Sequence, residues 1–134
     1  MRPALLLLCS AALLAGLPTQ ARSPRPRIAE LQHSPAQAML NSLDSMTNKL
    51  NQVSSRQEAE TAAPELLQLH QEYLVRRDAA EDMPEMPSRA LDRHLARLDS
   101  SMNHFRLACA RLLREKCYGS AQLRNAIQTV ARDF

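Results

Sequence analysis

Residues 88–117, with the sequence SRALDRHLARLDSSMNHFRLACARLLREKC, decide the fold class of this chain. Apolar side chains recur there at spacings of three and four residues, at Leu91, Leu95, Leu98, Met102, Phe105, Cys109 and Leu112. Charged residues, most of them arginines, fill many of the positions in between. Because an α-helix repeats every 3.6 residues, this spacing predicts an amphipathic helix from about Ser88 to about Cys117, whose apolar face must pack against other helices.

A capping-box sequence marks the start of an earlier helix. Ser34 is followed by Pro35, which suits the first helical position, and by Gln37 at the third. We therefore predict an amphipathic helix from about Pro35 to about Val53. Its apolar residues keep helical spacing, and they are Ala36, Met39, Leu43, Met46, Leu50 and Val53.

A second capping box, Ser55 with Glu58, begins a helix that we expect to extend to about Ala80. Pro64 lies inside this helix, where a proline removes one backbone hydrogen bond and clashes with the preceding turn. The alternatives are a kink at residues 60–64 or a short first turn followed by a restart, and we favour the kink because the apolar pattern keeps its phase. That pattern consists of Ala59, Ala62, Ala63, Leu66, Leu69, Tyr73 and Leu74.

The turn Tyr118-Gly119-Ser120 separates the long helix from a short fourth helix. The apolar residues of this fourth helix are Leu123, Ala126, Ile127, Val130 and Phe134. A connector with two prolines, residues 83–87, separates the second helix from the third. Four amphipathic helices with short connectors bury their apolar faces only against one another, so residues 34–134 are predicted to be an all-α antiparallel up-down helical bundle of three longer helices and a short fourth.

Composition supports a single helical domain. The 134 residues include only two Gly, two Phe, two Tyr and no Trp, which disfavours strand-rich folds. The net charge of +3 comes from the N-terminal region, because from Ile28 onward 13 basic residues face 14 acidic ones. A nucleic-acid partner is therefore not indicated.

The first 21 residues have the pattern of a secretory signal peptide. Arg2 precedes an apolar run from Ala4 to Leu17, and small residues lead up to an expected cleavage site between Ala21 and Arg22. These 14 apolar residues are fewer than the roughly 20 that a membrane span needs. We expect an exported protein, periplasmic or secreted, with no transmembrane segment after cleavage and with residues 22–33 as an extended Arg/Pro-rich arm.

Two cysteines, Cys109 and Cys117, remain after the expected cleavage. Eight residues of continuous helix separate two Cα atoms by about 12 Å, whereas a disulfide allows about 7 Å. An internal bridge would require the helix to end by about Leu113 and fold back. We predict a buried Cys109 thiol and an accessible Cys117 thiol, with a homodimer linked through Cys117 as an alternative.

No constellation of catalytic, cofactor-binding or metal-binding residues emerges, so we predict that the protein is not an enzyme. The glycine motifs of nucleophile elbows and phosphate loops are missing from the sequence. Haem between Met39 or Met46 and the last helix is disfavoured because that helix contains no His. Other weak candidates are an isolated Glu-x-x-His pair, three separate histidines and two methionines of the connector: Glu30, His33, His70, His94, His104, Met83 and Met86.

Three stretches resemble a loosely defined group of small exported bacterial helical-bundle proteins of unassigned function. They are residues 43–53, AETAAPEL at 59–66 and CYGSAQL at 117–123. The resemblance implies a bacterial exported protein but no activity. The expected function is therefore non-enzymatic binding of an unknown protein or envelope component through a helix face, and the alternatives are a periplasmic stress-type chaperone and a metal-binding or haem-binding bundle.

Overall fold

The computed structural model describes residues 34–82 and 86–134, and within these ranges it contains helices but no strand. The expected signal peptide, residues 1–21, and the arm, residues 22–33, lie outside the described residues. The predicted all-α bundle of three longer helices and a short fourth is confirmed. The elements are α2 (Pro35–Asn51), α3 (Arg56–Glu81), α4 (Ser88–Arg114), the 3-10 helix η1 (Lys116–Gly119), α5 (Ala121–Val130) and the 3-10 helix η2 (Ala131–Asp133).

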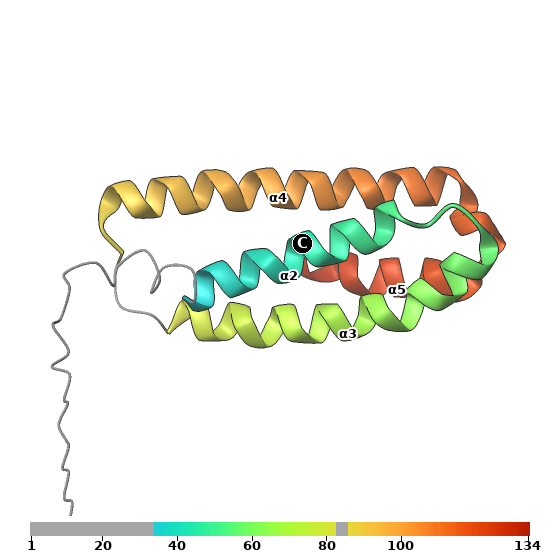
Figure 1. Cartoon of the computed structure of the whole chain (residues 1–134), viewed down its shortest axis with the longest axis horizontal. Coiled ribbons are helices and arrows are strands. Elements are labelled where there is room, and N and C mark those ends of the chain that lie inside the picture. The colour runs from blue at the N-terminus through green and yellow to red at the C-terminus, as the bar shows by residue number, and fades with distance from the viewer. Residues whose placement is uncertain (1–33, 83–85) are drawn as a thin grey trace, which may run out of the picture.

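Helix α2 is the central element of the bundle. It contacts both α3 and α4, whereas α5 packs mainly on α3 (Figure 1). Along the long axis of the molecule, α5 extends beside only the end that holds the C-terminal half of α4 (Figure 1). The bundle is therefore complete at that end, and at the other end α4 rests mainly on α2.

The helix starts follow the sequence signals. Each of the three predicted N-cap serines accepts a hydrogen bond at 3.2 Å from the backbone N–H three residues later: Ser34 from Gln37, Ser55 from Glu58 and Ser120 from Leu123. These bonds satisfy backbone donors that have no partner within the first helical turn. The three starts that the sequence places at serines are thereby confirmed.

Helix α3 is continuous through Pro64. The alternative of a restart at this residue is therefore wrong, and the first turns of α3 are inclined to the rest of the helix in Figure 1. Pro64 is exposed, so its ring lies on the solvent side of the helix. A kink on that side allows the alanine-rich face of α3 to keep its contact with α2.

The predicted apolar face of α4 is buried along only half of the helix. Phe105, Cys109 and Leu112 lie in the core, whereas Leu91 is 41% exposed and Leu95 is 51% exposed. The prediction that these two leucines face the core is wrong. The reason is the length of α5, because a helix of ten residues does not reach the N-terminal half of α4.

The end of α4 also differs from the prediction. The helix ends at Arg114, and Lys116, Cys117 and Tyr118 then have φ values of 53°, 51° and 51°. This left-handed backbone reverses the chain and places Cys117 in the core, fully buried. The predicted helix end near Cys117 and the predicted accessible thiol are both wrong.

Candidate interaction surface

The N-terminal half of α4 carries an apolar surface that the other described elements cover only in part. We call Leu91, Leu95, Leu98 and Met102 the α4 strip. Their spacings of four, three and four residues place them on one face of the helix. Leu91 and Leu95 are exposed, whereas Leu98 and Met102 are partly buried against the edge of the core. The strip runs for about three helical turns, or about 17 Å.

One edge of the α4 strip is bounded by α2. Ser101 donates a hydrogen bond of 2.8 Å to the carboxylate of Asp44 on α2. Nearer the start of α4, Arg93 and Arg97 line a surface groove of about 330 Å³ together with α2 residues, among them Leu40. Arg93 and Arg97 therefore lie on the far side of the contact of α4 with α2, away from the strip.

The other edge of the α4 strip is open and acidic. Asp92 follows Leu91, and Asp99 follows Leu98, so the two carboxylates lie seven residues apart along the same edge. Both are exposed. In the described part of the chain neither carboxylate has an ion-pair partner, in contrast to Glu60, which pairs with Arg56 at 2.9 Å.

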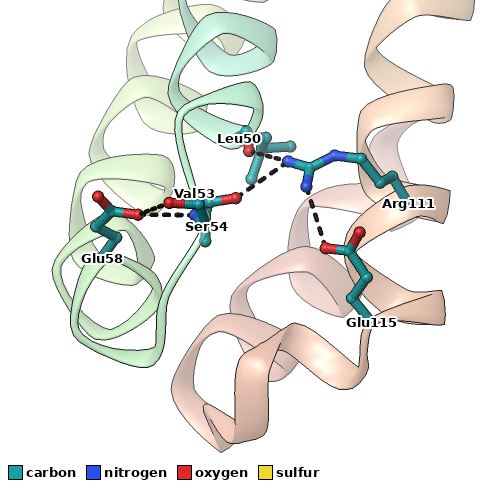
Figure 2. A network of polar contacts seen from close by, with 6 residues as sticks. All are labelled: Leu50, Val53, Ser54, Glu58, Arg111 and Glu115. Atoms are coloured by element: carbon teal, nitrogen blue, oxygen red, sulfur yellow. Dashed lines mark hydrogen bonds and ion pairs between the residues drawn. The ribbon is translucent and has the colours of Figure 1, made fainter.

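A polar network fixes the opposite end of α4 to α2 (Figure 2). Arg111 donates through Nη2 to the backbone oxygens of Leu50, at 2.8 Å, and Val53, at 3.3 Å, and through Nη1 to the Glu115 carboxylate at 3.1 Å. These two carbonyls lie at and just beyond the end of α2, where helical partners run out. The C-terminal half of α4 is thus anchored by a charged donor.

The segment between α2 and α3 is held by Glu58. Ser54 donates to the Glu58 carboxylate through both its backbone N–H and its hydroxyl, each at 2.7 Å (Figure 2). These hydrogen bonds stabilise the ionised form and lower the pKa of Glu58. Capping by Ser55 and the reach of Glu58 back to Ser54 together define the turn.

The end of the described chain packs between α3 and α4. The Phe134 ring lies with its centroid 4.9 Å from the rings of both Tyr73 and Phe105, and its backbone oxygen accepts a 3.0 Å hydrogen bond from Arg106. Burial raises the pKa of Tyr73. Phe134 thus links two helices that make little direct contact with each other.

The histidines occupy three different environments. His104 is exposed, and His94 is half-buried in the groove between α2 and α4. His70 is buried, with Nε2 2.8 Å from a carboxylate oxygen of Asp133. Helical spacing could not predict this carboxylate as a partner of His70, because Asp133 lies 63 positions further along the chain.

The remaining candidate ligand residues either pack within the bundle or lie outside the described residues. Met39 and Met46 are core residues. Within residues 34–82 and 86–134, no group of three or more His, Cys, Asp or Glu side chains is placed to hold a metal ion. Glu30, His33 and Met83 lie outside the described residues, and Met86 lines the groove between α2 and α4.

The two cysteines of the bundle are free thiols in the same core. Burial raises the pKa of Cys109 to about 12, with a further contribution from the neighbouring Cys117. Burial also raises the pKa of Cys117. A homodimer linked through Cys117 would therefore require this core position to open.

Comparison of the chain with protein-family models, with curated proteins and with solved structures finds no match. Among the described helices, none is both long enough and apolar enough to cross a membrane. The class of protein is therefore defined by the fold, an all-α helical bundle, and the candidate site is the apolar face of α4 that the described part of the bundle leaves open.

Proposed function

We propose that this protein is a non-enzymatic binding protein that takes a helix of a partner protein onto the α4 strip. The observation that carries the proposal is the exposure of Leu91 and Leu95 in a regular apolar face whose continuation, at Phe105 and Leu112, is core. An amphipathic helix of about three turns matches the length of the strip. Such a helix would complete the bundle at the end that α5 does not reach.

The shape of the surface favours a helix over a small ligand. The strip is a convex helix face, and small molecules bind preferentially in concave pockets that enclose most of their surface. A helix laid along α4 instead packs side chains between the exposed leucines, as neighbouring helices do in any bundle. Each Å² of apolar surface that such a contact removes from water contributes about 25 cal/mol to the free energy of binding.

Peptide binding tests this proposal. The probe is a synthetic helical peptide of 14 residues with a leucine face and glutamine at the flanking positions, labelled for fluorescence anisotropy. We expect binding to the protein, and binding at least about tenfold weaker to Leu91→Ser/Leu95→Ser, because truncating apolar contacts typically costs 1–3 kcal/mol. The matched control is Leu107→Ser, which removes a leucine of 60% exposure outside the strip.

We also infer that binding takes place outside the cytoplasm, on the support of the signal-peptide pattern in residues 1–21. Cleavage between Ala21 and Arg22 would leave an N-terminus at Arg22. The intact mass of exported protein measures this directly, and a chain that retains Met1 would contradict the export proposal. The peptide experiment does not depend on this point.

A further inference from the structure

The two edges of the α4 strip differ in what a bound helix would meet. On one edge stands α2, with Arg93 and Arg97 beyond it. On the open edge stand Asp92 and Asp99, exposed and without an ion-pair partner in the described part of the chain. Any helix that covers the strip therefore places one row of its own flanking side chains against two carboxylates.

The spacing of these carboxylates matches a helix repeat. Seven residues correspond to almost two turns, so Asp92 and Asp99 are separated by about 10 Å along the helix axis. Arg106, which follows at the same interval, is already engaged by the backbone oxygen of Phe134. Between Leu91 and Met102 both charges on this edge are negative, and Arg106 adds a positive charge one turn beyond the strip.

We propose that the partner helix is basic along this edge, with Lys or Arg residues about seven positions apart beside its leucine face. The proposal rests on the proposed function and specifies the partner for the same surface. Opposite charges flanking a helix–helix seam set partner choice and orientation, whereas like charges disfavour pairing.

A second copy of this chain does not have the required charge pattern. Two α4 strips paired antiparallel about their midpoint would bring Asp92 of one copy close to Asp99 of the other. Arg97 lies in the groove on the α2 side. Arg89 and Arg93 line a shallow surface pocket with Asp92 on the side away from the strip. None of these arginines therefore stands between the two facing carboxylates. Charge therefore favours a different chain over self-association.

The test compares three peptides with one leucine face and with Gln, Lys or Glu at the flanking positions. At about 20 mM salt, where the Debye length is roughly 20 Å, we expect the Lys peptide to bind about three- to tenfold more tightly than the Glu peptide. The difference should shrink in about 0.5 M salt. Asp92→Asn/Asp99→Asn should abolish it, and Asp78→Asn, an exposed α3 aspartate, should leave it unchanged.

The outcomes separate this inference from the proposed function. If the three peptides bind equally, the strip binds helices but the charge preference is overturned. If the Glu peptide binds best, the inference is overturned as well. If no peptide binds, the proposed function itself is wrong. A concentration-dependent dimer in sedimentation velocity that Leu91→Ser/Leu95→Ser abolishes would assign the strip to a second copy and overturn the inference.

Discussion

Three consecutive residues without glycine's freedom, Lys116, Cys117 and Tyr118, adopt left-handed backbone conformations after α4. Left-handed backbone at a residue with a Cβ atom destabilises the folded state by roughly 1–2 kcal/mol. The reversal is stabilised by hydrogen bonds from the Tyr118 N–H to the Glu115 carbonyl, 3.1 Å, and from the Ser120 N–H to the Cys117 carbonyl, 2.9 Å. Burial of the Cys117 side chain adds to this. Gly119, at φ 82°, completes the turn without strain.

At the residue scale, the thiols give the first prediction. Under native conditions we expect a thiol reagent to label both Cys109 and Cys117 slowly, because both are buried and burial raises the pKa of each. At pH 9 labelling of Cys109 should still be far slower than that of an exposed thiol, because a pKa of about 12 leaves almost all of this thiol protonated. Peptide mass spectrometry after timed labelling measures each site separately.

The control is labelling in denaturant, where both thiols are exposed and should react rapidly. Above the ordinary thiol pKa of 9.0 the unfolded chain releases protons that the folded chain retains, so the free energy of unfolding should fall as pH rises beyond that value. Rapid native labelling of Cys117 would contradict the buried turn. Absence of labelling in denaturant without reductant would instead indicate a disulfide.

At the element scale, α4 is a helix with two unlike halves. Its C-terminal half is anchored by Arg111 and buries Phe105 and Leu112. Its N-terminal half contacts α2 and leaves Leu91 and Leu95 in solvent. The same helical repeat therefore serves as core at one end and as an open surface at the other.

Arg111→Gln should lower the free energy of unfolding by about 1–2 kcal/mol, because the backbone oxygens of Leu50 and Val53 lose a charged donor. The side chain is 30% exposed, so water replaces part of the lost bonding. Urea unfolding followed by circular dichroism measures the change. Arg114→Gln, an exposed neighbour on the same helix, should change stability by less than about 0.5 kcal/mol. Equal effects of the two substitutions would mean that the Arg111 hydrogen bonds do not contribute to the free energy of unfolding.

At the scale of the whole molecule, the bundle is closed by the residues that follow α5. The Phe134 ring packs at a tilt against Tyr73 on α3 and Phe105 on α4, and the Asp133 carboxylate contacts the buried His70. These contacts join α3 and α4 at the point where α5 ends. Helix α5 is short, and Phe134 closes the core beside Phe105. These two features together explain why the apolar face of α4 is buried from Phe105 onward and open on the N-terminal side of it.

Phe134→Ala should destabilise the fold by about 1–3 kcal/mol, below the range for a fully buried Phe because this side chain is half-buried. The near-ultraviolet circular dichroism of Tyr73 should weaken, since its ring loses a neighbour at 4.9 Å. Arg132→Ala, at an exposed position of η2, is the matched control. An unaltered near-ultraviolet spectrum in Phe134→Ala would contradict the aromatic cluster.

Local patterns determined the helices of this protein. The serine caps at Ser34, Ser55 and Ser120 and the apolar repeat of α2 all depend on neighbours within a few residues, so they could be predicted without the fold. The all-α class followed from the same repeats. The absence of a catalytic, cofactor or metal site stays a prediction.

Only the tertiary structure decided which parts of those repeats are buried. Leu91 and Cys109 lie five full turns apart on one face of α4, yet one is exposed and the other is core, because burial depends on how far α5 extends beside α4. The reversal that buries Cys117 and the approach of Asp133 to His70 likewise depend on where distant segments pack. Periodicity is a property of one helix, whereas an open surface is a property of the helices around it, and the candidate binding strip belongs to the second kind.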